Sequence, residues 1–217
     1  MQRLQDAIDQ YNASRTRCWD HDYTTLLAPG PAAEADLARL REREPRPLPA
    51  ELEAFYRRFG GLHNHHNTES HCLELPAPAA LAEGLERADE WQRIRSLGLV
   101  DVIVHSWGND RYEFEPGEAF AQAELDALNA GYRCFGWYRT DTVSESAWYV
   151  YADAQERFGA LYYDQDGFGH VERSLRAMLA ASPARQSLEE VLCEGVERAR
   201  QAMIEWHGDG SEDADSA

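Results

Sequence analysis

The sequence predicts an α+β (α/β) fold, in which helices cover a mostly antiparallel mixed sheet of about five to six strands. Segments rich in β-branched and aromatic residues cluster between residues 99 and 163. Apolar residues at helical spacing occupy both ends of the chain. The strand-like segments follow one another too closely for repeated βαβ units, so antiparallel pairing is expected.

The N-terminal residues 1–47 predict a helical extension that packs on the core of the domain. Leu4, Ile8 and Tyr11 form an apolar stripe at helical spacing. A Pro- and Gly-rich break at residues 28–31 then separates this helix from a second, shorter one. The main domain is expected to span residues 48–207.

The clearest helix signal lies between Pro49 and the pair Gly60-Gly61. Proline suits the first turn of a helix, and Glu51 complements the positive end of the helix dipole. Either glycine can adopt the left-handed conformation that ends a helix. The buried face is expected to consist of Leu52, Phe55, Tyr56 and Phe59.

The middle of the chain alternates between loop, strand and helix signals. Residues 63–71 are polar and predict a loop, followed by a short strand at 72–75 and a helix at 79–97. The β-branched run at 99–104 predicts a central strand, paired with a strand at 111–114.

The C-terminal part predicts three further strands and the helices around them. Ser187 and Glu190 fit a capping box that opens the last helix. The tail 208–217 holds four acids and no base, which predicts disorder. We expect helices at 117–129, 171–181 and 188–206, and strands at 133–138, 147–151 and 159–163.

The charge of the chain favours a basic protein as its partner. The 217 residues include 39 acids and 21 bases, all of them Arg, for a net charge of −18. A field of this size repels nucleic acids and membrane surfaces. No apolar run reaches the ~18 residues of a membrane helix, and the start of the chain is polar. We therefore expect a cytoplasmic protein that binds neither nucleic acid nor membrane.

No catalytic motif stands out, so the chain is expected not to be an enzyme and to need no cofactor. The motifs G-x-S-x-G, H-E-x-x-H and the phosphate-binding glycine loops are missing from the sequence. Residues 164–167 begin like a calcium loop but lack its later ligands, so a turn is expected. The segment 63–72 carries weak candidates for zinc ligands, but its spacing favours a polar loop without metal; these candidates are His63, His65, His71 and Cys72.

Two parts of the chain resemble the SUKH superfamily. Leu48-Pro49, an aromatic helix and Gly60-Gly61-Leu62 are similar to the family's entry motif. Tyr162-Tyr163-Asp164 and the helix around residues 174–179 are similar to a later one, and Leu73 to Pro76 and a strand at 102–107 fall in the expected order. The resemblance implies an immunity protein of a bacterial polymorphic toxin system, such as type VI secretion in interbacterial competition. It carries over no catalytic residue.

An acidic, aromatic surface is the expected binding site. Residues 101–172 hold fourteen acids and four Arg among many aromatic rings, although the rings could equally form the core. The expected partner is a cognate toxin, a basic nuclease, bound by a monomer or homodimer. A regulatory or scaffolding protein of the same fold, or a metal-dependent enzyme using His63 to Cys72, are the alternatives. The candidate toxin-binding residues are Asp110, Glu113, Glu115, Trp137, Tyr138, Asp141, Glu145 and Asp166.

Overall fold

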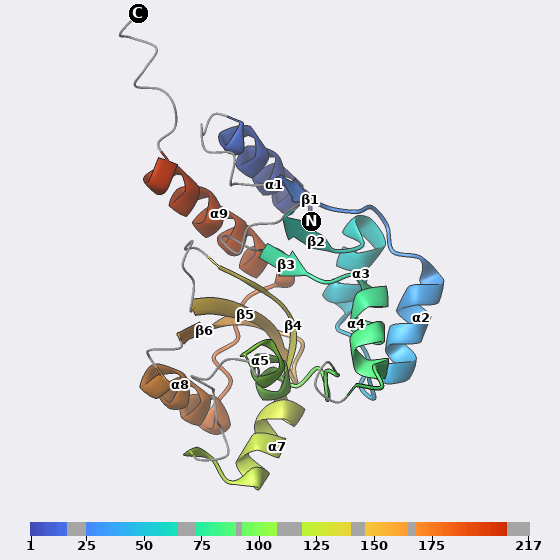
Figure 1. Ribbon diagram of the computed structural model, residues 1–217, viewed down its shortest axis with the longest axis vertical. Coiled ribbons are helices and arrows are strands. Elements are labelled where there is room, and N and C mark those ends of the chain that lie inside the picture. Colours follow the sequence, from blue (N-terminus) through green and yellow to red (C-terminus); the bar gives the residue numbers. More distant parts are fainter. Residues whose placement is uncertain are drawn as a thin grey trace, which may run out of the picture.

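The computed structural model describes residues 1–16, 25–64, 73–89, 93–107, 119–139, 146–164 and 168–207. These segments form a sheet with helices on both faces (Figure 1). The predicted α+β fold class is confirmed. Among the described helices, none is long and apolar enough to cross a membrane.

The sheet is an antiparallel meander of six strands in chain order within the described part of the chain. The three longest strands form one half of it, and a bulge between Cys134 and Gly136 interrupts their regular pairing. The strands are β1 (Leu26–Leu27), β2 (Leu62–Asn64), β3 (Leu73–Leu75), β4 (Tyr132–Tyr138), β5 (Ser146–Asp153) and β6 (Phe158–Asp164).

Alternation along the strands divides the core into two clusters. Val150 and Ala152 face one cluster, while Tyr149 and Tyr151 face the other. The first cluster contains helices α1 (Gln2–Arg15), α2 (Glu34–Arg43), α3 (Ala50–Phe59), α4 (Pro78–Glu86) and α9 (Leu188–His207). The second contains α5 (Leu99–Trp107), α7 (Gln122–Gly131) and α8 (Phe168–Ala180).

Helix α3 confirms the sequence prediction. Pro49 occupies its N-cap, and Gly60 ends it in the left-handed region at φ 72°. The Gly60 N–H donates to the carbonyl of Tyr56, which satisfies one of the last carbonyls of the helix. Its predicted inner face, formed by Leu52, Phe55, Tyr56 and Phe59, is buried.

The run Leu99 to Val104 is helical, so the predicted central strand is wrong. Leu99 and Ile103 are fully buried one turn apart. The Asn129 side-chain oxygen accepts bonds from the N–H groups of Val100 and Asp101, at 3.0 and 3.1 Å, and so caps the helix from α7. A short buried apolar run has no periodicity that separates helix from strand. The partner strand expected at 111–114 lies outside the described residues.

Helix α4 ends at Glu86, ten residues or more before the predicted end at residue 97. Beyond it the chain folds back, and the Ile94 N–H donates to the carbonyl of Gly84 at 3.0 Å. Ala88, which falls inside the predicted helix, lies beyond its observed end and is exposed. His63, expected in a loop, lies in β2, and β1 was not predicted. The three longest strands and the helices α7, α8 and α9 lie where the sequence predicted them.

The Tyr56 hydroxyl is buried with no hydrogen-bond partner among the described residues. Burial raises the pKa of this phenol. Because the hydroxyl loses its bonds to water on folding, Tyr56→Phe should leave the free energy of unfolding unchanged or raise it by up to about 2 kcal/mol. Urea unfolding measures this difference.

A matched variant gives the control for that result. The Tyr132 hydroxyl donates to the carbonyl of Met178 at 2.7 Å, so Tyr132→Phe should lose about 1 kcal/mol. If both variants lose the same free energy of unfolding, the Tyr56 hydroxyl has a stabilising partner in the folded protein, which would contradict the structure.

Candidate binding surface

Three aromatic rings lie side by side across the last three strands, and we call them the aromatic row. Tyr138 on β4 is the cross-strand neighbour of Trp148 on β5, which in turn faces Tyr162 on β6. The ring centroids are 5.9 and 4.9 Å apart. The row runs from the interior to the surface, since Tyr138 is 2% exposed and Tyr162 is 38% exposed.

Helix α9 packs over this row. A Cβ at Gly195 would meet the Tyr138 ring at 2.9 Å, so glycine allows the close approach of helix and sheet. One turn on, the Arg198 guanidinium lies 4.6 Å from the centroid of the Trp148 ring. A cation over an aromatic face is attracted by the ring quadrupole. This contact holds Arg198 at the boundary between the row and the solvent-facing side of α9.

On that side of α9 lies a hollow of about 570 Å³. We call it the α9 hollow, and Arg198 belongs to both it and the aromatic row. Its walls combine acidic, basic and amide side chains with one thiol. They are Arg3, Gln186, Glu190, Cys193, Glu194, Glu197 and Arg198.

Two acidic groups of the hollow, Glu190 and Glu197, are held in place by hydrogen bonds that favour their charged form. The Glu190 carboxylate accepts bonds from the Ser187 N–H and hydroxyl, which lower its pKa. In return the Glu190 N–H donates to the Ser187 hydroxyl oxygen, and this reciprocal pair confirms the predicted capping box. The Arg200 guanidinium donates to Glu197 at 2.6 Å and lowers the pKa of that carboxyl. Burial raises the pKa of the Cys193 thiol, which therefore stays protonated at neutral pH. The hollow thus offers fixed carboxylates beside a neutral thiol.

The aromatic row lies near one end of the sheet, where the segments that hold three of the six predicted acidic candidates are attached. The pairings Leu26 with Asn64, Leu73 with Tyr138 and Ser146 with Asp164 place these strand ends together. The segments 17–24, 65–72, 140–145 and 165–167 begin or end there, and their sequences hold six acids and one Arg. The candidates Asp141, Glu145 and Asp166 belong to these segments and lie outside the described residues.

The two described toxin-binding candidates point to opposite faces of the sheet. Tyr138 is buried under α9, so it can support the row but offers no surface of its own. Trp137 is partly buried on the other face and pairs in register with Glu74. Burial raises the pKa of the Glu74 carboxyl. The remaining acidic candidates, Asp110, Glu113 and Glu115, lie outside the described residues.

Of the zinc-ligand candidates, only His63 lies in the described part of the chain. It sits in β2, opposite Glu74 of β3. His65, His71 and Cys72 lie outside the described residues. Among the residues that the structure describes, no group of three or more His, Cys, Asp or Glu side chains could hold a metal ion.

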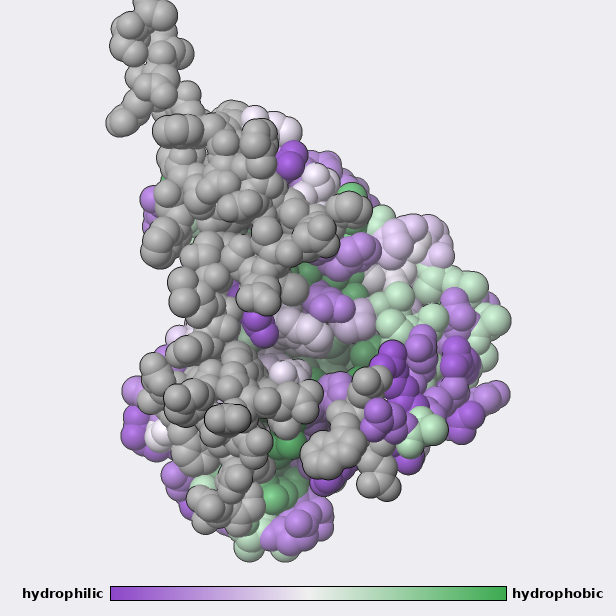
Figure 2. Space-filling model, viewed as in Figure 1, coloured by the Kyte–Doolittle hydropathy of each residue, from purple (hydrophilic) through white to green (hydrophobic). Residues whose placement is uncertain are grey.

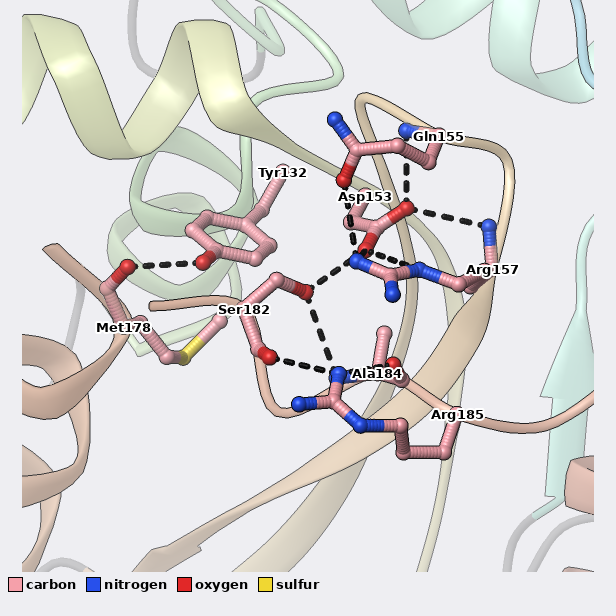
Figure 3. Close-up of polar contacts among 8 residues, drawn as sticks. All are labelled: Tyr132, Asp153, Gln155, Arg157, Met178, Ser182, Ala184 and Arg185. Carbon is pink, nitrogen blue, oxygen red and sulfur yellow. Dashed lines mark hydrogen bonds and ion pairs between the residues drawn. The ribbon is translucent and has the colours of Figure 1, made fainter. Parts of the chain in front are cut away.

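A polar cluster around Asp153, at the opposite end of the sheet, holds the segment that precedes α9 (Figure 3). Asp153 ends β5 and is 2% exposed. It accepts bonds from the backbone N–H groups of Gln155 and Arg157, from the Arg157 guanidinium at 2.7 Å and from the Ser182 hydroxyl at 2.6 Å. The chain then reaches Gln186, which pairs with Phe158 at the start of β6. The cluster therefore anchors the segment that leads into the α9 hollow.

Sequence reasoning missed the row and the hollow because both combine distant segments. In the sequence, Trp148 is one of many aromatic rings between residues 101 and 172, and Arg198 is one of several charges on a helix. The motif Tyr162-Tyr163-Asp164 was the one local signal that marked the exposed end of the row. No family model matches the chain, and no curated protein or solved structure does.

Proposed function

We propose that the chain is an immunity protein, which binds a cognate bacterial toxin and neutralises it by occluding its active site or substrate groove. The observation that carries this proposal is the stack of Arg198 on Trp148, with Tyr162 exposed beside it. Tryptophan, tyrosine and arginine are the residues that most often dominate the energy of protein interfaces. Here Trp148 contacts both Tyr162 and Arg198, and these contacts restrict the side chains before binding and so reduce the entropy lost on binding.

The hollow beside this stack suits the partner's side chains. Its three carboxylates lie on α9 next to the aromatic row, where they can pair with basic side chains of the partner. Such polar contacts fix the orientation of the partner, which aromatic contacts alone do not. A net charge of −18 accelerates association with a basic protein. A nuclease carries a basic groove for phosphates, so a basic nuclease is the partner that we propose.

The order of elements supports the resemblance to the SUKH superfamily in part. The Leu48-Pro49 entry leads into α3 and its glycine stop, and Tyr162-Tyr163-Asp164 ends β6 before α8. The segment 102–107, expected as a strand, is helical and departs from the pattern. The family assignment therefore remains part of the proposal.

The surface is tested by co-purification with the protein encoded immediately upstream, once that protein is shown to be toxic. Tyr162→Ala and Arg198→Ala should each weaken binding by about 10-fold or more, because each removes an anchor of the row. Tyr162→Phe keeps the ring and should retain most of the affinity. Binding titrations with the purified toxin measure these ratios.

The control is Arg173→Ala, an exposed arginine on α8, which packs on the other face of the sheet. It removes the same charge as Arg198→Ala and should leave binding unchanged. If both arginine variants weaken the complex equally, or neither Tyr162→Ala nor Arg198→Ala does, the α9 surface is not the binding site.

A further inference from the structure

A second hollow, far along the surface from α9, gathers arginines on a protein that is otherwise strongly acidic. It measures about 540 Å³ and lies between α2, α4 and the segment after α4. We call it the arginine hollow. Figure 2 shows strongly hydrophilic residues on the side where α2 and α4 lie together. Its walls are Glu42, Arg43, Leu85, Glu86, Arg93 and Arg95.

One carboxylate organises two of the arginines on α2. Arg39 and Arg43 lie one turn apart, and both donate to Glu86 at the end of α4. The Arg43 Nε bond to Glu86 is 2.7 Å long, and Arg39 binds both carboxylate oxygens. The shared carboxylate fixes the Arg43 guanidinium at this edge of the hollow, whereas Arg39, which also interacts with Glu83 and Asp36, lies outside the walls.

Backbone packing brings the other two arginines to the hollow. Ile94 bonds to the Gly84 carbonyl, and a Cβ at Gly84 would meet the Ile94 side chain at 2.8 Å. Glycine therefore lets this segment lie directly on α4, with Arg93 and Arg95 on either side of Ile94. Within the ranges that the structure describes, neither arginine makes a hydrogen bond or ion pair.

We propose that the arginine hollow binds a soluble phosphate-bearing anion. The walls carry three arginines, Arg43, Arg93 and Arg95, and two carboxylates, Glu42 and Glu86, so their charge is 3 − 2 = +1 on a chain of net charge −18. Guanidinium groups bind phosphate oxygens in pairs of parallel hydrogen bonds. Glu86 orients Arg43 and Arg39, and the unpaired groups of Arg93 and Arg95 supply the donors for the ligand.

Titration calorimetry of the full chain with inorganic pyrophosphate, at constant ionic strength, tests this site. The wild-type chain should bind it saturably at one site. The double variant Arg93→Gln, Arg95→Gln should bind at least about 10-fold more weakly, since it loses the two uncommitted donors.

The matched control is the double variant Arg58→Gln, Arg173→Gln, which lowers the charge by the same amount at exposed positions elsewhere. It should bind pyrophosphate as the wild type does. Absence of saturable binding to the wild-type chain, or equal weakening in the two double variants, overturns the proposal. Circular dichroism of each variant establishes that the fold is intact.

Discussion

Replacing Gly60 with Ala should lower the free energy of unfolding by about 2–5 kcal/mol. Gly60 ends α3 at φ 72°, a conformation that costs an L-residue with a Cβ about 1–2 kcal/mol. The added Cβ would also collide with the carbonyl oxygen of Gly30 and lie 3.2 Å from its carbon. Gly30 is fixed there because its N–H donates to the carbonyl of Phe59, so the backbone has little freedom to move away.

Gly131→Ala is the matched control for this variant. Gly131 ends α7, and a Cβ there would meet nothing within 4 Å. Alanine is the better helix former by about 1 kcal/mol, so this variant should be as stable as the wild type or more so. Urea unfolding of both variants measures the contrast. A Gly60→Ala chain as stable as the wild type would show that α3 does not need its left-handed end.

Asp153→Asn should destabilise the fold by about 2–4 kcal/mol. One carboxylate oxygen accepts two backbone N–H groups, and the other accepts the Ser182 hydroxyl and the Arg157 guanidinium. In the Asp153→Asn variant, the side-chain NH₂ group replaces one of these two acceptor oxygens in either orientation of the amide. It therefore faces groups that are themselves donors. The ion pair itself adds little, because the Arg157 side chain is 41% exposed. Most of the loss comes from buried hydrogen bonds.

This loss should depend on pH in a defined direction. Burial raises the pKa of Asp153, but bonds from Ser182, Arg157 and Gln155 outweigh it, and the net pKa is lowered. The folded-state pKa therefore lies below the unfolded value of about 3.9, and the stabilisation is present above that pH. It disappears as the pH falls through the folded-state pKa.

Unfolding measured from pH 7 down to pH 3 checks both statements. The difference in the free energy of unfolding between the wild type and Asp153→Asn should stay constant above about pH 5 and become smaller below about pH 4. The control Asp126→Asn, on the exposed side of α7, should change stability by less than about 0.5 kcal/mol. A gap that widens in acid would contradict the assignment of Asp153 as a charged acceptor.

Local signals predicted the parts of the fold that local physics decides. Pro49, the apolar face of α3 and Gly60 act within one helix, so their pattern could be read directly from the sequence. The strand prediction for residues 99–104 was wrong because α5 is capped by Asn129, about thirty residues further along the chain. Its apolar residues are nearly all buried, which removes the amphipathic pattern that distinguishes the two structures.

The candidate site was less predictable because it depends on register and packing. Trp137 and Tyr138 are neighbours in sequence, yet strand alternation sends them to opposite faces. The partners of Tyr138 are Trp148 and Tyr162, which only the pairing of β4, β5 and β6 brings beside it. Arg198 joins them from a helix whose position over the sheet depends on Gly195. None of these relations has a local sequence signal.

Co-expression with the protein encoded immediately upstream tests the central claim most directly, with bacterial growth and co-purification as readouts. We expect the wild-type chain to restore growth and to form a stable complex, and Arg198→Ala to protect less well than Arg173→Ala. A neighbouring protein that is shown to be toxic, yet is neither bound nor neutralised by the wild-type chain, would contradict the account.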